Sequence, residues 1–183
     1  MALQTTTKLT YDDYVLIPDD GLRHEIIDGE HYVNPAPNVR HQRVLRRVFL
    51  AVANFVEEHD LGEVFFSPID VVFSQHNVVQ PDLIFVRKEN TGELHGAFVK
   101  IAPDLVIEVL SKSTRTHDKV RKLKVYDTFK VAEYWIFDPE NDLVSIYRRS
   151  GANLTLVEKL DVDGTIASPL FPGFALPAQV VFA

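Results

Sequence analysis

The sequence contains no cysteine, so the chain can form neither a disulfide framework nor a thiolate metal site. It has no apolar run approaching the roughly 20 residues that a membrane-spanning helix requires. Residues 1–14 are largely polar and show no apolar core of a signal peptide. These absences argue against a disulfide-rich secreted domain and against membrane insertion, and we expect a cytoplasmic protein.

An excess of basic residues is also missing, because 19 Lys and Arg stand against 26 Asp and Glu, for a net charge of −7. Nucleic-acid-binding domains are usually basic, so this balance argues against general, tight binding to DNA. Ten of the 19 positive charges nevertheless fall in two segments: Arg40, Arg43, Arg46 and Arg47, and then Lys112, Arg115, Lys119, Arg121, Lys122 and Lys124. The two segments form either a local basic surface or two ordinary solvated helix faces.

The composition is that of a folded globular chain. Apolar residues make up 46% of its 183 residues and charged residues 25%, without repeats or low-complexity stretches. This length suits a single domain, residues 1–183, with enough material for a hydrophobic core.

Apolar periodicity and turn signals predict an α/β fold with a mixed central sheet flanked by helices. Asp28-Gly29 is a hairpin turn signal, and a strand–helix–strand unit over 104–137 is expected to supply a parallel pair. The main predicted elements are a hairpin over 23–33, helices over 39–59 and 114–130, and strands over 81–86, 103–109 and 133–137. The apolar tail, 168–183, is expected along an edge strand or in a dimer interface.

Two of these strands begin with the same pattern, Pro81-Asp82 and Pro103-Asp104. The second continues as an apolar run with a lone carboxylate, Glu108, in its middle. Burying an ionised carboxylate is costly unless it is paired or binds a metal. Such violations of a local rule concentrate at functional sites.

Asp82 and Glu108 are the best pair for one metal site. They lie on different strands, and neighbouring strands are only about 4.8 Å apart, whereas Asp104 and Glu108 are roughly 13 Å apart along one strand. Two carboxylates, a backbone carbonyl and waters suit Mg²⁺, with Mn²⁺ as an alternative. Zinc is disfavoured, because cysteine is absent and the seven histidines show no tight ligand spacing.

The helix after Glu108 supplies a candidate cation. Lys122 is expected on the rim of an apolar stripe formed by Val120, Leu123, Tyr126 and Phe129, with Lys124 more exposed. Asp118 stands one turn earlier, at ion-pair spacing. An ammonium group there could orient a water or stabilise developing negative charge. A structural cluster of Asp82, Lys122 and Glu108 without metal would give the same pattern.

Several motifs follow one another in an order that is itself informative. They are His24-Glu25-Ile26-Ile27-Asp28-Gly29-Glu30, Gln80-Pro81-Asp82, Pro103 to Ser111, Ser113-Thr114, Asp118, Lys122 and Glu133-Tyr134-Trp135. The ordered set resembles the PD-(D/E)XK nuclease superfamily, and more closely its putative restriction-endonuclease family, over nearly the whole chain.

This resemblance implies a Mg²⁺-dependent endonuclease that hydrolyses DNA. It implies that Asp82, Glu108 and the Val109 carbonyl bind the metal and that Glu25 contributes a further acidic group. The superfamily's lysine stands two residues after the glutamate, where this chain has Leu110, and the family resemblance points to Lys122 as its replacement. Since cutting both strands requires two sites, we expect a homodimer.

Other interpretations remain open. Leu110 and the acidic net charge also suit a catalytically inactive DNA-binding or protein-interaction module with the same fold. A metal hydrolase acting on a small phosphoester is a third option. Glu25 is either a site residue or an exposed strand residue, and His41 is expected on an exposed helix face rather than as a catalytic base.

Overall fold

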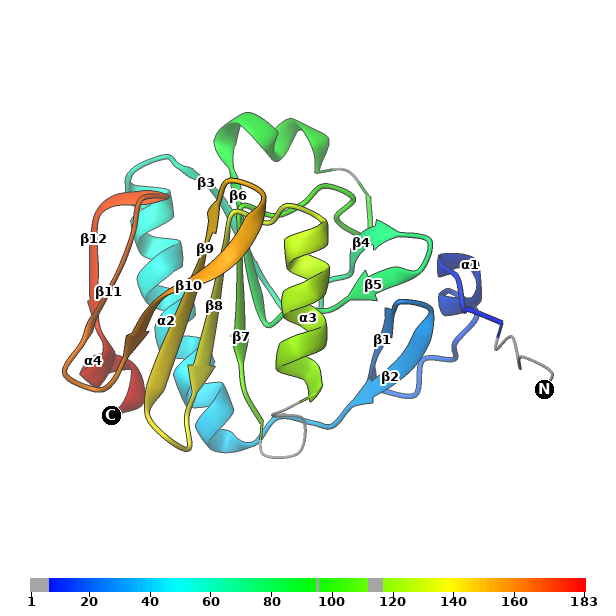
Figure 1. Ribbon diagram of the computed structural model, residues 1–183, viewed down its shortest axis with the longest axis horizontal. Helices are drawn as coiled ribbons and strands as arrows, with labels where there is room; N and C mark the ends of the chain where they lie inside the picture. The colour runs from blue at the N-terminus through cyan, green and yellow to red at the C-terminus, as the bar shows by residue number, and fades with distance from the viewer. Residues whose placement is uncertain (1–6, 95, 112–116) are drawn as a thin grey trace.

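The computed structural model describes residues 7–94, 96–111 and 117–183, apart from the side chains of 117–119 (Figure 1). Its helices are α1 (Tyr11–Tyr14), α2 (Val39–Glu58), the 3-10 helix η1 (Lys88–Glu93), α3 (His117–Thr128) and α4 (Ala178–Phe182). Its strands are β1 (Arg23–Ile27), β2 (Glu30–Asn34), β3 (Gly62–Phe66), β4 (Val71–Ser74), β5 (Asn77–Val79), β6 (Leu83–Arg87), β7 (Leu105–Val109), β8 (Glu133–Asp138), β9 (Leu143–Ser150), β10 (Asn153–Leu160), β11 (Thr165–Ser168) and β12 (Phe171–Pro177).

A six-stranded mixed sheet in the order β10-β9-β8-β7-β6-β3 forms the centre of the molecule. Among the described strands of this sheet, only β7 and β8 pair in parallel, and α3 connects them (Figure 1). A smaller sheet, β2-β1-β5-β4, contains the hairpin expected at Asp28-Gly29. The predicted α/β fold with a mixed central sheet is confirmed.

Alternation along β7 divides the core into two layers. Leu105, Ile107 and Val109 belong to the apolar cluster that includes α2, whereas Val106 belongs to the cluster that includes α3. Since side chains alternate between the two faces of a strand, Glu108 faces the α3 layer together with Val106. Both faces of this strand are covered, which explains its nearly continuous apolar sequence.

The buried face of α3 differs from the predicted stripe. Val120 is 67% exposed, whereas Lys122, Val125 and Tyr126 are buried and Phe129 is partly buried. These four follow the spacing i, i+3, i+4, i+7, so Lys122 lies within the buried face rather than on its rim. Lys112, Arg115 and the proposed Ser113-Thr114 cap lie outside the described residues, as do the side chains of Asp118 and Lys119.

The carboxyl-terminal segment is part of the core of this chain. Phe171 and Phe174 of β12 and Val181 of α4 pack in the same apolar cluster as α2. Burial against α2 satisfies these apolar side chains within the chain, and β12 pairs with β11 in a two-stranded sheet. The expected dimer interface stays a prediction. Among the described helices, none is long and apolar enough to cross a membrane.

Candidate active site

Asp82 and Glu108 meet at one end of the central sheet. Asp82 directly precedes β6, and the antiparallel register pairs Leu83 with Ile107, so Glu108 lies beside it on β7. Both carboxylates are buried, and both line a cavity of about 40 Å³ together with Val109 and Lys122. A cavity of that size holds an ion or a few waters but not a nucleotide.

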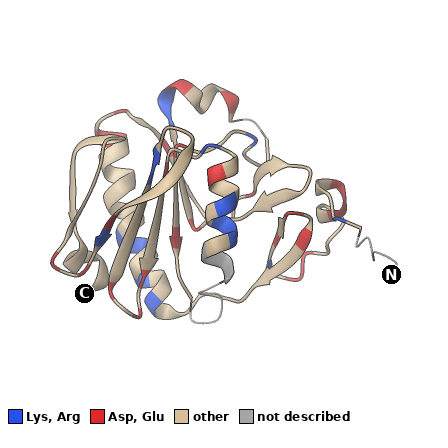
Figure 2. Ribbon diagram, in the orientation of Figure 1, with Lys and Arg blue, Asp and Glu red and all other residues tan. Residues whose placement is uncertain are grey.

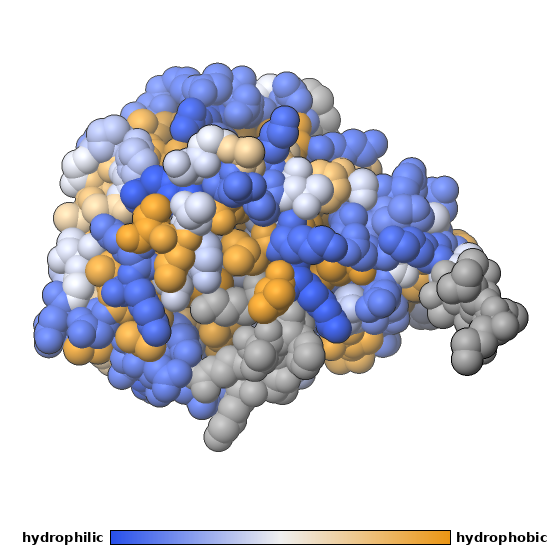
Figure 3. Space-filling view, in the orientation of Figure 1, coloured by the Kyte–Doolittle hydropathy of each residue, from blue (hydrophilic) through white to orange (hydrophobic). Residues whose placement is uncertain are grey.

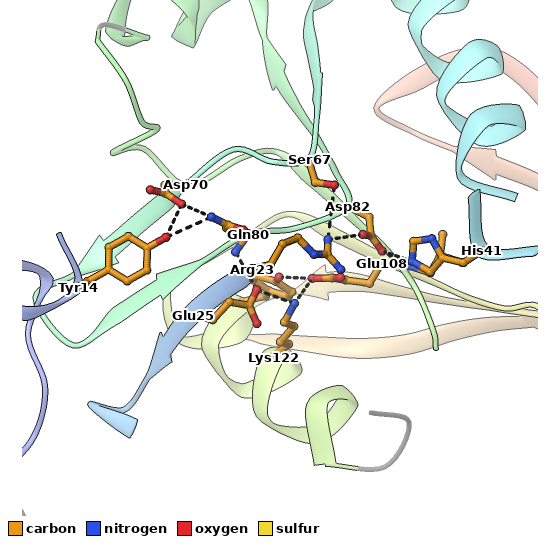
Figure 4. A network of polar contacts seen from close by, with 12 residues as sticks. Tyr14, Arg23, Glu25, His41, Ser67, Asp70, Gln80, Asp82, Glu108 and Lys122 are labelled. Atoms are coloured by element: carbon orange, nitrogen blue, oxygen red, sulfur yellow. Dashed lines mark hydrogen bonds and ion pairs between the residues drawn. The ribbon is translucent and has the colours of Figure 1, made fainter. Parts of the chain in front are cut away.

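Asp82 accepts hydrogen bonds at both carboxylate oxygens (Figure 4). Arg23 donates to Oδ1 at 2.9 Å, while His41 Nε2 (3.1 Å) and the Val109 backbone N–H (2.9 Å) donate to Oδ2. Burial by itself raises the pKa of Asp82, but the hydrogen bond from His41, the charges of His41 and Arg23 and the Val109 N–H outweigh it. The net pKa of Asp82 is about 2, so this group is ionised at neutral pH.

Glu108 is less well compensated than Asp82. Its Oε1 accepts from Lys122 Nζ and from the Tyr126 hydroxyl, each at 2.8 Å. Burial raises the pKa of Glu108, Lys122 lowers it, and the negative charges of Asp82 and Glu25 raise it again, to about 7. Burial is therefore the main reason that Glu108 is hard to ionise, and the neighbouring carboxylates add to it.

Lys122 bridges two acidic residues from different elements. Its Nζ lies 2.8 Å from Glu108 and 2.9 Å from Glu25 Oε1, on β1. Burial lowers the pKa of Lys122, but the charges and hydrogen bonds of Glu108 and Glu25 together raise it by more. The net pKa of Lys122 therefore lies above its ordinary value. Lys122 stays an ammonium group and cannot serve as a general base.

Glu25 points inward and links the site to a second polar cluster. It is 1% exposed, and its Oε1 also accepts from the Gln80 backbone N–H at 2.8 Å. The Gln80 side chain donates to Asp70, which also accepts from the Tyr14 hydroxyl of α1 (Figure 4). The alternative of an exposed strand glutamate is excluded for Glu25.

Two residues of this site were not anticipated. His41 was expected on an exposed helix face, but it is 3% exposed, because the first turn of α2 packs over the start of β6. The spacing of His41 from the buried Val44, Leu45 and Val48 could have placed it in the apolar stripe. Arg23 could have been found from its two-residue spacing to Glu25 on one strand.

The donor set fits a hard divalent ion. Among the described residues, no three His, Asp or Glu side chains form a ready-made metal-binding group. Asp82 and Glu108 nevertheless line one cavity, and backbone oxygen can complete such a set. The N–H and C=O groups of one strand residue point to the same side of the strand. Because the Val109 N–H donates to Asp82, the Val109 carbonyl is expected on the side of Asp82 as well.

Basic residues lie at the same end of the sheet as this cavity. Figure 2 shows Lys and Arg on the first turns of α2 and on α3, in the half of the molecule where β7 ends. Arg40 and Arg47 donate hydrogen bonds to backbone carbonyls of Pro139 and Val181. Arg43 and Arg46 are exposed to solvent.

A family model described as "Uma2: Putative restriction endonuclease" matches residues 11–179. A crystal structure of a putative nuclease belonging to DUF820 from Anabaena variabilis ATCC 29413 has a TM-score of 0.83 to this chain at 19% sequence identity. That match covers 95% of this chain and 97% of the other, and it shows a common fold. No curated protein matches the sequence.

Proposed function

Because the chain belongs to the Uma2 family of putative restriction endonucleases, we propose that it is a Mg²⁺-dependent endonuclease hydrolysing DNA phosphodiester bonds. Mn²⁺ is expected to replace Mg²⁺. One observation carries the proposal: two buried carboxylates from adjacent strands share a small cavity with a buried ammonium group. The pKa of Glu108, raised to about 7 mainly by burial and further by Asp82 and Glu25, adds to it, because a cation bound beside Glu108 would stabilise its ionised form.

In this proposal Asp82, Glu108 and the Val109 carbonyl hold the metal. When bound, the ion polarises the scissile phosphate and lowers the pKa of a coordinated water. Lys122, 2.8 Å from Glu108, would supply a fixed positive charge beside the proposed metal ligands, to orient a water or to offset negative charge that develops on the phosphate. Glu25 holds Lys122 in place from the opposite side.

The missing lysine at position 110 does not weaken this assignment. Leu110 is partly buried and packs against the apolar cluster that includes α3, whereas Lys122 reaches Glu108 from α3. An ammonium group 2.8 Å from the glutamate supports Lys122 as its functional replacement.

DNA is the proposed substrate, because exposed Arg43 and Arg46 lie on the helix that delivers His41 to Asp82. Arginines at such positions can bind phosphates on either side of a cut site. We also propose a homodimer, since double-strand cleavage requires two sites. The exposed Leu156 and Val157 on the edge strand β10 are a candidate contact. Figure 3 shows hydrophobic residues among polar ones on the face of the molecule that β10 crosses.

Nicking of supercoiled plasmid in Mg²⁺ or Mn²⁺ tests the proposal. Asp82→Asn and Glu108→Gln should each lower the rate at least about a hundredfold, because each removes a proposed metal ligand. Asp104→Asn is the matched control: it alters the second Pro-Asp motif, where Asp104 accepts from the Arg87 N–H away from the cavity. It should retain activity.

Three other results have distinct meanings. Equal nicking by wild type and all variants identifies a contaminating nuclease. DNA binding without metal-dependent nicking favours the inactive module, which agrees with the occupation of both Asp82 oxygens by protein donors. Cleavage of a nucleotide analogue without cleavage of DNA indicates a small-phosphoester hydrolase.

A further inference from the structure

The three groups that bind Asp82 differ in their freedom to move. His41 is 3% exposed and fixed by the packing of α2, and the Val109 N–H belongs to the backbone of β7. The Arg23 side chain is 24% exposed and starts at the first residue of β1. Only Arg23 can leave Asp82 without disturbing the core, and its departure frees Oδ1 alone.

Few other contacts hold Arg23 in its position. Its second polar contact, to Ser67 Oγ, is long at 3.5 Å. Its buried Nε has no hydrogen-bond partner within the part of the chain that the structure describes. An unpartnered buried donor is rare and costly in folded proteins. Arg23 is therefore poorly satisfied beside a cavity that it helps to line.

The local charges explain why a cation is needed at this position. Glu25, Asp82 and Glu108 face Arg23 and Lys122, with His41 bound to Asp82. Removal of the Arg23 charge would leave three carboxylates facing Lys122 and His41, with Asp82 Oδ1 no longer bound by Arg23. A divalent ion entering the cavity would supply that charge, so Arg23 and the metal compete for Asp82.

We propose that Arg23 is an internal counter-ion that occupies Asp82 until the DNA phosphate draws it away, so that metal binding and DNA binding favour each other. This inference rests on the proposed function. Arginine binds phosphate as well as it binds carboxylate, and phosphate satisfies several of its donors at once. Coupling between two ligands is reciprocal. DNA would therefore increase the affinity for the metal by the same factor as the metal increases the affinity for DNA.

Mn²⁺ binding to the intact chain without DNA, followed by electron paramagnetic resonance, tests this competition. Arg23→Met removes the charge, and Arg23→Gln removes it while keeping a donor for Asp82. Both should bind Mn²⁺ on the order of tenfold or more tightly than wild type. Mn²⁺ should also raise the melting temperature of both variants more than that of wild type.

Arg148 is the matched control. It pairs at 2.8 Å with the buried Glu133, has a similar exposure of 29%, and lies at the opposite end of the β7–β8 pair. Arg148→Met and Arg148→Gln lose a comparable ion pair, but their Mn²⁺ affinity should equal that of wild type. A gain in these variants as large as in the Arg23 variants would overturn the inference.

Failure of the inference is distinguishable from failure of the proposed function. If wild type nicks plasmid with Mn²⁺ but the Arg23 variants bind Mn²⁺ no more tightly, the Arg23 inference is wrong and the nuclease proposal stands. If wild type shows no metal-dependent nicking and neither it nor the Arg23 variants bind Mn²⁺, both are wrong. Should Arg23→Met fail to fold, Arg23→Gln decides the outcome.

Discussion

Replacing Lys122 by methionine removes one positive charge on which two buried carboxylates depend, while keeping a side chain of similar length. Lys124, on the same helix, provides the control. Lys124 Nζ lies 3.1 Å from Asp28, a distance close to those that Lys122 makes, but its side chain is 73% exposed against 7% for Lys122. The two substitutions differ in burial and in the number of carboxylates that lose a partner, two for Lys122 and one for Lys124.

The expected magnitudes differ several-fold. Removing one partner of a buried ion pair costs about 3–5 kcal/mol of unfolding free energy, because the other charge stays buried and unpaired. Exposed pairs contribute about 0–1 kcal/mol. In a protein of this size, Lys122→Met should lower the melting temperature by roughly 6–20 °C, and Lys124→Met by no more than about 4 °C.

Urea denaturation at pH 7.5, followed by circular dichroism, measures the difference. The pKa of Lys122 is raised above its ordinary value of 10.5, so its stabilisation is complete below pH 10.5 and is lost only as the pH rises through the folded pKa. The Lys122→Met loss should shrink at pH 5, where Glu108 takes up a proton. Losses within 1 kcal/mol of each other for Lys122→Met and Lys124→Met at pH 7.5 would refute the buried cluster.

Three further predictions concern individual groups. The pKa of Glu108 is raised from 4.5 to about 7, so the folded state keeps a proton that the unfolded state loses, and the free energy of unfolding should fall by about 3 kcal/mol between pH 4.5 and 7. Urea denaturation of Glu108→Gln at several pH values should not show this fall. If the fall persists in the variant, another group causes it. His41→Ala removes a hydrogen bond that lowers the pKa of Asp82, so that pKa should rise from about 2. Titration of the Asp82 carboxyl carbon by carbon-13 NMR measures the change. An unchanged pKa would contradict the His41–Asp82 contact. Arg43→Ala and Arg46→Ala should each weaken DNA binding. If each arginine contacts one phosphate, each substitution should also reduce the salt slope, the dependence of the logarithm of the binding constant on the logarithm of the salt concentration, by about 0.9. Lys88→Ala, on the exposed η1 segment that follows the far end of β6, should leave that slope unchanged, and an equal effect would locate the DNA elsewhere.

Local rules predicted much of the framework of this chain. The apolar runs with Pro-Asp starts gave β6 and β7, and Asp28-Gly29 gave the β1–β2 hairpin. The spacing between neighbouring strands is a constant of sheet geometry, so Asp82 and Glu108 could converge if their strands were neighbours, and β6 does lie beside β7. Lys122 was indicated by the family resemblance together with the helix predicted after β7.

The partners of Asp82 could not be read from local patterns. His41 looks like an ordinary polar residue in the first turn of a helix, and only the docking of α2 across the start of β6 buries it. Arg23 meets Asp82 across 59 residues of sequence, between two different sheets. The burial of Phe171, Phe174 and Val181 likewise depends on where the tail crosses α2.

The sequence alone determined the strand and helix periods and the presence of a carboxylate in a buried run, because these depend on residues close along the chain. Only the tertiary structure decided how the charges around those carboxylates are balanced. That balance depends on distances of about 3 Å between elements far apart in sequence, and on burial, which sets how strongly each charge acts.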